Sequence, residues 1–284
     1  MNQHVVNHLP NGARLAVQQV LRSFLSHGGL AGLFVTGSMA RGLPEPDDLD
    51  LVAIWDDPLS DDDRGRLVAS CRGNHVGDPD TDRFHLHGVV PEFHFMAGKQ
   101  QVADMLADFC WKSEPPPESD ADRAEGLLAS LSDALPVHDP ECLAHSWQKM
   151  LNEDYPDEYR RRRVHEQYTA ACRRLAHLCR CGAQRDVLYR LRGRLEFIEY
   201  LVKALVSLNR TFYWGPKWNQ AQLDRLRLKP DNMWERVSRT MSGRPNLPLP
   251  AMRSLALDTG SLIRLNLPGV DISFSTSIIQ QISP

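Results

Sequence analysis

Long apolar runs are missing from this chain of 284 residues. A membrane-spanning helix needs roughly 20 consecutive apolar residues, and no stretch of the sequence provides them, so we expect no membrane partner. The opening MNQHVVNHLPNGARL also lacks the basic start and apolar centre of a secretory signal peptide. These absences predict a cytoplasmic protein.

Cysteine is sparse as well. The six cysteines of the chain form no CxxC pair and give no disulfide framework, which predicts reduced thiols. One cluster, Cys172, His177, Cys179 and Cys181, contains residue types that can bind zinc. Its spacing fits no common zinc module, so we interpret these cysteines as structural.

An excess of one charge is absent too. The net charge is -3, with 42% hydrophobic and 24% charged residues, which is ordinary globular composition and gives no global basis for coating nucleic acid. The run Arg160 to Arg163 could form an RNA-binding patch, but neighbouring acidic residues favour a solvated helix face. The sequence leaves the oligomeric state open.

Apolar spacing divides the chain into two parts. In the first, it predicts strands over 33–36, 48–55 and 83–96, the last broken near Gly88 or Pro91. It also predicts helices over 13–25, 61–71 and 100–111. Leu15, Val17, Val20, Leu21 and Leu25 are the expected core residues of the first helix. This pattern predicts a mixed β-sheet with flanking helices.

The second part is predicted to be helical. Helices are expected over 156–181, 185–209, 219–228, 231–241 and 249–265, with Gly182 as a C-cap between the first two. The Pro-rich SEPPPESDAD at 113–122 suggests a domain boundary. We therefore expect an α+β fold with domains 1–118 and 119–284, the second a helical bundle that binds substrate and forms one wall of a cleft.

Two aspartates begin the predicted strand 48–55. Asp48 and Asp50 are two residues apart and share one face of the strand, and such a carboxylate pair suits Mg²⁺. Upstream, Gly37 lets the backbone approach a ligand closely, while Ser38 and Arg41 suit phosphate oxygens. Glu92 is a lone acid in an apolar strand, and we predict it as the third carboxylate. Together these residues predict phosphoryl or nucleotidyl transfer.

The motif Gly-Ser, nine residues, Asp-x-Asp, followed by a later strand carboxylate, resembles the nucleotidyltransferases of the DNA polymerase β superfamily. It is most similar to the small-molecule branch, which includes the aminoglycoside and lincosamide enzymes. The resemblance covers about residues 30 to 96. It implies that Gly37 and Ser38 hold the triphosphate, that Asp48 and Asp50 bind Mg²⁺, and that Glu92 is a third ligand or the catalytic base. Pro91 before Glu92 departs from the usual third motif.

The segment LRGRLEFIEYLVKALVSLNRTFYWGPKW resembles the helical domain of bacterial nucleotidyltransferase-like proteins that carry a similar LN…Y…PKW loop. Lys217 of this loop is a predicted phosphate ligand. Other residues here are candidates for an acceptor pocket: Glu196, Glu199, Tyr200, Lys203, Asn209 and Tyr213. A glutamate of this helical part is the alternative to Glu92 as the catalytic base. The alternatives are ion pairs on a bundle helix for the charged residues and packing at the bundle end for the aromatic ones.

These observations predict an enzyme that moves a nucleoside monophosphate, AMP in the first instance, from an NTP to a hydroxyl of a small molecule such as an antibiotic or metabolite. Two Mg²⁺ ions are the expected cofactors, and pyrophosphate is the expected product. Three alternatives stay open. The enzyme could modify tRNA or a protein, it could build a nucleotide-bearing metabolite, or the chain could be a non-catalytic nucleotide-binding module.

Overall fold

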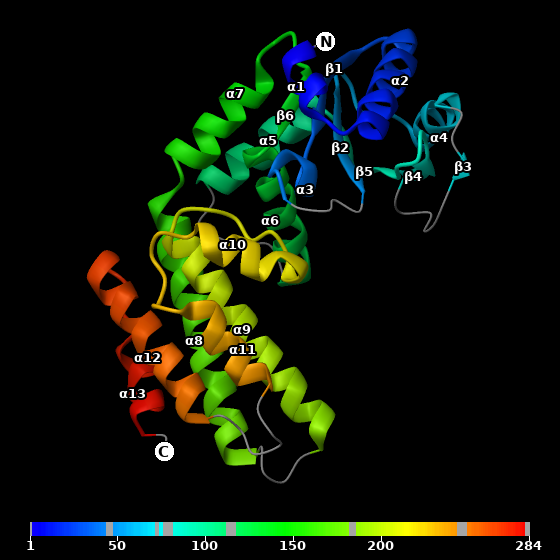
Figure 1. The fold of residues 1–284 in the computed structure, drawn as a ribbon. Helices are drawn as coiled ribbons and strands as arrows, with labels where there is room; N and C mark the ends of the chain where they lie inside the picture. The colour runs from blue at the N-terminus through cyan, green and yellow to red at the C-terminus, as the bar shows by residue number, and fades with distance from the viewer. Residues whose placement is uncertain are drawn as a thin grey trace. The chain divides into compact units, whose positions relative to one another are not determined.

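The structure is a computed structural model and describes residues 2–43, 48–71, 74–75, 82–111, 118–181, 186–242 and 249–281 (Figure 1). The chain divides into two compact units, Met1–Asp154 and Tyr155–Pro284. The first unit is built on a mixed β-sheet and the second is helical, which confirms the expected α+β fold. Within the described ranges, none of the helices combines the length and apolar character needed to cross a membrane.

Six strands form the sheet, in the order β3-β4-β5-β2-β1-β6. They are β1 Leu30–Val35, β2 Leu49–Trp55, β3 Asn74–His75, β4 Asp82–His85, β5 Pro91–Gly98 and β6 Leu135–His138. Strands β2 and β5 run parallel, and the other neighbours are antiparallel. The predicted strands near 33–36 and 48–55 are confirmed. The predicted strand 83–96 is divided into β4 and β5 by a turn at Gly88, as expected.

Helices flank this sheet, and the three predicted ones correspond to α2, α4 and α5. The helices are α1 Gln3–His8, α2 Asn11–His27, α3 Gly37–Ala40, α4 Asp61–Ser70, α5 Lys99–Trp111, α6 Glu118–Ser132 and α7 Leu143–Gln148, followed by a π-helical turn, η1 Lys149–Glu153. In α2, Val17, Val20 and Leu21 are buried as predicted, whereas Leu15 and Leu25 are exposed. The predicted apolar face of α2 was therefore too wide.

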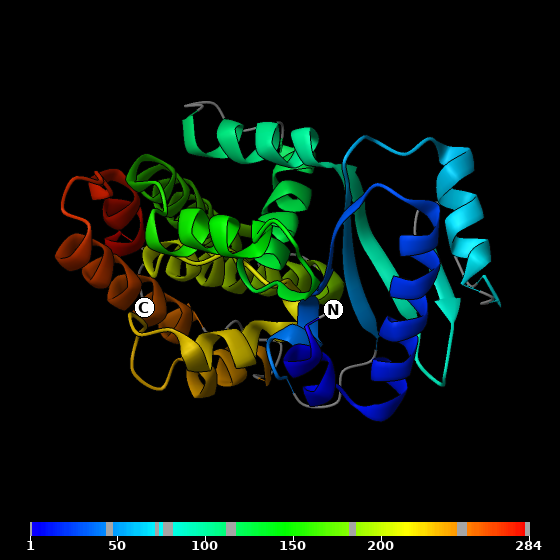
Figure 2. The same cartoon turned by 90° about the horizontal axis from the view of Figure 1, so that it is seen from above.

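The alternating side chains of β2 divide between two faces of the sheet. Leu51, Ala53 and Trp55 belong to the apolar cluster that includes the buried side of α2, which lies along the sheet (Figure 2). Successive strand residues point to opposite faces, so Asp50 lies on the face away from this cluster. The α2 core can therefore be fully apolar without accommodating the aspartate.

The predicted boundary between residues 118 and 119 differs from the division in the structure. Strand β6 follows α6 and pairs antiparallel with β1, with Val35 opposite Leu135. Its hydrogen bonds and the buried Val137 hold this segment in the sheet unit, which continues to Asp154. A Pro-rich stretch indicates a connection between elements, but it does not distinguish a loop within a domain from a linker between domains.

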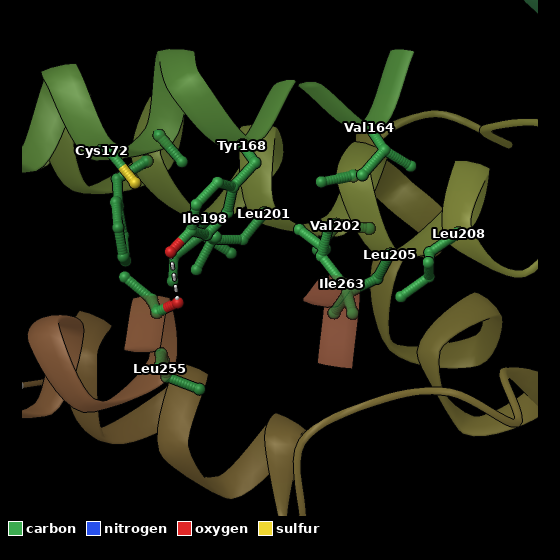
Figure 3. Packing of buried hydrophobic residues seen from close by; sticks show 14 of the residues in the cluster. Val164, Tyr168, Cys172, Ile198, Leu201, Val202, Leu205, Leu208, Leu255 and Ile263 are labelled. Atoms are coloured by element: carbon green, nitrogen blue, oxygen red, sulfur yellow. Dashed lines mark hydrogen bonds between the residues drawn. The ribbon is translucent and has the colours of Figure 1, made fainter. Parts of the chain in front are cut away.

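The second unit has two long helices, α8 Asp157–Cys181 and α9 Val187–Leu208, as predicted. The shorter elements are η3 Pro216–Trp218, α10 Asn219–Arg225, α11 Met233–Ser242, α12 Leu249–Asn266 and α13 Ser273–Gln280. The sequence reasoning missed α13, and the predicted C-cap Gly182 lies outside the described residues. Figure 3 shows α8 and α9 facing each other across buried side chains, with α12 against them.

Two arginines of the run 160–163 have structural roles. Arg160 is buried and donates two hydrogen bonds, of 3.1 and 2.6 Å, to the carbonyl oxygen of Leu208 at the end of α9. Arg163 is also buried. The predicted solvated face is therefore wrong for these two residues. Arg160 satisfies a helix-terminal carbonyl that has no partner within its own helix, and so connects the start of α8 to the end of α9.

Candidate metal and nucleotide site

The three predicted carboxylates lie together in the structure. Asp50 on β2 and Glu92 on β5 are directly paired in the parallel register of the two strands, and Asp48 lies two residues before Asp50. One carboxylate oxygen from each residue lies within 4.8 Å of the others. Asp50 and Glu92 are buried, with 7% and 5% of their surface exposed, and Asp48 is half-buried. The parallel pairing of β2 and β5 thus assembles the cluster.

The donor set of this cluster suits a hard divalent cation. All three groups offer carboxylate oxygens, which Mg²⁺ prefers over nitrogen or sulfur ligands. Carboxylates this close repel one another when ionised, and a cation among them reverses the sign of that interaction. The cluster fits a metal, and residues Asp48, Asp50 and Glu92 are the ones that could hold it.

The Gly-Ser turn lies directly beside Asp50. The backbone N–H of Thr36 donates to the carbonyl oxygen of Asp50 at 2.9 Å, which continues the β1–β2 ladder to the start of α3. Gly37 then adopts a φ of +63°, a left-handed conformation that glycine enters without steric cost. Its Cα faces the Asp50 side chain so closely that a β-carbon would collide with the carboxylate. The predicted neighbours Gly37 and Asp50 are therefore in contact.

Two hydroxyl groups flank this glycine. The Ser38 Oγ and Thr36 Oγ1 atoms are buried and have no hydrogen-bond partner among the residues that the structure describes. A buried hydroxyl without a partner is destabilising, so each is available to a ligand oxygen. Sequence reasoning selected Ser38 and missed Thr36. The polar Thr36 between an apolar strand and the Gly-Ser pair was the signal that could have identified it.

Arg41 has a different environment from the one predicted. Its Nε donates to Asp133 Oδ2 at 2.8 Å and its Nη2 to the carbonyl oxygen of Ala129 at 3.3 Å, and its side chain is only 5% exposed. The guanidinium therefore connects the turn after α3 to the end of α6. This gives Arg41 a role in positioning the Gly-Ser turn, and its contact with phosphate stays a prediction.

The charged acceptor candidates of the second unit form ion pairs. Glu196 pairs with Arg174 and, at 2.8 Å, with Arg192. Glu199 pairs with Lys203 at 3.1 Å, one turn along α9. The buried Lys203 also lies over the Tyr213 ring, 5.1 Å from its centroid. These contacts are those of the bundle-helix alternative, and the acceptor role of these residues stays a prediction.

Tyr200 and Lys217 are placed where a ligand could reach them. Tyr200 lines a cavity of the helical unit that is described below. Lys217 is exposed in η3, with its ammonium 5.4 Å from the centroid of the Trp218 ring. Neither position tests the predicted contacts with acceptor or phosphate, and both stay predictions.

Asn209 is engaged in local structure. Its side-chain amide donates to the carbonyl oxygens of Leu205 and Leu228 at 2.7 and 2.8 Å, and its Oδ1 accepts from the Leu228 N–H at 2.8 Å. The residue therefore caps α9 and holds the segment after α10 against it. This use of all its polar atoms argues against the predicted acceptor role.

Replacing Asn209 by Ala is expected to lower the free energy of unfolding by about 2–4 kcal/mol, because it leaves the partly buried polar groups of Leu228 without their partners. Chemical denaturation measures the change. Asn209→Asp is the matched control, since it can keep the bond from the Leu228 N–H but places a negative charge beside two carbonyls, so it should also destabilise. A wild-type unfolding curve for Asn209→Ala would contradict the structural role.

The cysteines of the helical unit behave as core residues. Burial raises the pKa of the Cys172 thiol to about 12, and burial also raises the pKa of Cys179. A cysteine binds a metal as its thiolate. The buried environments of Cys172 and Cys179 disfavour that charged form. Among the described residues, the cluster with side chains placed to hold a metal ion is Asp48, Asp50 and Glu92. These observations agree with the structural interpretation of the cysteines.

The sequence shows no similarity to the known protein families and curated proteins with which it was compared. Among solved structures, the chain is similar to a nucleotidyltransferase-like protein from Exiguobacterium sibiricum 255-15, with 12% identity and a TM-score of 0.42, over 93% of this chain and 77% of that one. The carboxylate cluster, and not this distant similarity, supports the function proposed below.

Proposed function

We propose that the protein is a Mg²⁺-dependent nucleotidyltransferase that transfers a nucleoside monophosphate from an NTP to a hydroxyl of a small molecule. The observation that carries this proposal is the cluster of Asp48, Asp50 and Glu92 beside the Gly-Ser turn. Three carboxylates that converge within 4.8 Å, two of them buried, are costly for a fold without a cation. The position of these carboxylates next to the available hydroxyl groups of Thr36 and Ser38 supports a site for metal and phosphate.

Each residue of the site has a task in this reaction. Asp48 and Asp50 hold the metal, which when bound supplies positive charge against the phosphate oxygens. The hydroxyl of Ser38 donates to a phosphate oxygen, and Gly37 allows the backbone to approach the nucleotide. Glu92 accepts the proton of the acceptor hydroxyl. The acceptor oxygen then bonds to the α-phosphorus, and the bond from that phosphorus to the leaving pyrophosphate breaks.

The helical unit is proposed to contribute acceptor recognition, as expected from the sequence. Tyr200, Tyr213 and Lys203 are the residues we assign to it, and Lys217 is assigned to the nucleotide. Glu196 and Glu199 are each held in ion pairs, which makes Glu92 the better choice for the base. AMP is the proposed transferred group, with two Mg²⁺ ions at the cluster.

The test is thermal unfolding of the purified protein with each NTP, with and without Mg²⁺. Ligand at a hundredfold excess over its Kd stabilises the native state by about 2.7 kcal/mol, so one NTP should raise the melting temperature only when Mg²⁺ is present. An α-labelled form of that NTP should then label a hydroxyl acceptor and release pyrophosphate. The absence of a Mg²⁺-dependent shift in melting temperature with all four NTPs would contradict the proposal. Transfer of the label to tRNA or protein would show that the acceptor is a macromolecule and not a small molecule.

A further inference from the structure

A cavity of about 1040 Å³ lies within the helical unit, among α8, α9, α12 and α13. This volume is at the upper end of the range for small-molecule sites. The helix α13 that closes one side is held to α8 by a buried hydrogen bond of 2.9 Å between Thr169 Oγ1 and Ser275 Oγ. The walls of the cavity that the structure describes are therefore formed mainly by packed helices.

One wall of the cavity is basic. Arg173, His177 and Arg180 of α8 line it at helical spacing, together with Arg174, whose charge is offset by Glu196. Arg173 and Arg180 are exposed and have no ion-pair partner in the parts of the chain that the structure describes. The described lining residues include no carboxylate. This wall therefore carries net positive charge.

The facing wall is apolar. Phe274 and Ile278, one turn apart on α13, line it, and Leu249 of α12 adds to it. Phe274 is 64% exposed, which is unusual for a residue of its size. Tyr200 of α9 offers an aromatic ring and a hydroxyl. A ligand that satisfies both walls has an apolar body and an anionic group.

We propose that this cavity binds a small organic anion with an apolar body, such as a carboxylate on an alkyl chain. The apolar body packs against Phe274 and Ile278, and the anionic group pairs with Arg173 and Arg180, because guanidinium groups bind carboxylates through charge-assisted hydrogen bonds. The cavity shares Tyr200 with the residues assigned above to acceptor recognition, but the proposal rests on the arginines and apolar side chains of the helical unit and is tested without NTP or Mg²⁺.

The test uses decanoate and decanol, which share an alkyl chain and differ in charge, below the critical micelle concentration of decanoate. Isothermal titration calorimetry of the full chain, without NTP or Mg²⁺, should show decanoate binding at least about tenfold tighter than decanol. Arg173→Glu should weaken decanoate binding by a further tenfold or more and leave decanol binding unchanged. Phe274→Ala should weaken the binding of both decanoate and decanol. Both replaced side chains are exposed, so the fold should persist.

The matched control is Arg239→Glu, which makes the same charge change at an exposed arginine of α11 that does not line the cavity. It should leave decanoate binding unchanged. Equal losses in Arg173→Glu and Arg239→Glu would reduce the effect to net charge and overturn the proposal. Equal affinity for decanoate and decanol, or no binding of either, would also overturn it. Association of the chain through Phe274, seen by sedimentation, would assign the apolar wall to a second copy instead.

Discussion

Metal-free protein that carries Asp50→Asn is expected to unfold at a higher temperature than the wild type, although the same change removes function. Like charges 4.8 Å apart repel by about 3 kcal/mol at an effective dielectric constant near 20. Asparagine keeps the shape of the side chain and removes two of the three repulsive pairs. Allowing for relaxation, we expect a gain of about 2 kcal/mol, or roughly 4–8 °C for a unit of this size.

The same variant should lose the Mg²⁺-dependent stabilisation by NTP and at least about a hundredfold in turnover, because a catalytic metal supplies several kcal/mol of transition-state stabilisation. Differential scanning calorimetry with EDTA, and then with Mg²⁺ and NTP, measures both the gain in melting temperature without metal and the loss of stabilisation by NTP. A turnover assay measures the loss of activity. A residue that merely supports the fold would lose stability and activity together, and that result would remove Asp50 from the metal site.

Asp57→Asn is the control for this variant. Asp57 lies two residues beyond β2 in the same unit, is exposed, and makes no ion pair in the described chain. The substitution is chemically identical and changes the net charge by the same amount. It should move the melting temperature by little and leave the response to Mg²⁺ and NTP intact, as expected of an exposed charge.

The grouping of the three carboxylates could be predicted from the sequence because most of the relations that produce it are local. The two-residue spacing of Asp48 and Asp50 predicts that both face the same way at the start of a strand, and Glu92 is the single acid in an apolar stretch of the sequence. Only the parallel register of β2 and β5, which pairs Asp50 with Glu92, depends on contacts distant in sequence. Arg41 shows the limit of such reasoning. Its partner Asp133 is 92 residues away, and no local pattern indicates that pair.

The same limit explains the errors in the fold. Helices α8 and α9 were predicted well, because in a long amphipathic segment the apolar residues recur with the helical period over several turns. Strand β6 has only four residues, LPVH, and it joins the sheet through pairing with β1 about 100 residues earlier. Strand pairing of this kind is not encoded in local periodicity. The predicted boundary at 118 therefore excluded from the first unit a strand that belongs to it.

Replacing Gly37 by Ala is expected to disrupt the site from the side of the turn. At a φ of +63°, a residue with a β-carbon costs about 1–2 kcal/mol. The added atom would also collide with the Asp50 carboxylate and lie 2.9 Å from the Asp50 β-carbon, so rotation of the side chain alone does not relieve the overlap. Overpacking of this kind adds about 1–3 kcal/mol. We expect a total loss of about 2–5 kcal/mol, together with the loss of Mg²⁺-dependent NTP binding.

Gly42→Ala separates the two contributions. Gly42 has a φ of +61°, nearly that of Gly37, but an added β-carbon there would have no atom of the described residues within 4 Å. It should cost only the backbone term of about 1–2 kcal/mol and leave NTP binding intact. Equal destabilisation by Gly37→Ala and Gly42→Ala, with NTP binding kept in both, would show that the contact between Gly37 and Asp50 has no role.

A double-mutant cycle then identifies the colliding residue. Asp50→Gly removes the three atoms nearest to the new β-carbon, all of which belong to the Asp50 side chain. In that background, Gly37→Ala should cost no more than Gly42→Ala does in the wild type, so the coupling energy equals the overpacking term of about 1–3 kcal/mol. Denaturant unfolding of the four proteins measures it. Because the comparison is made within pairs, the cost of Asp50→Gly itself cancels, and the coupling reports how closely the turn is fitted to the aspartate.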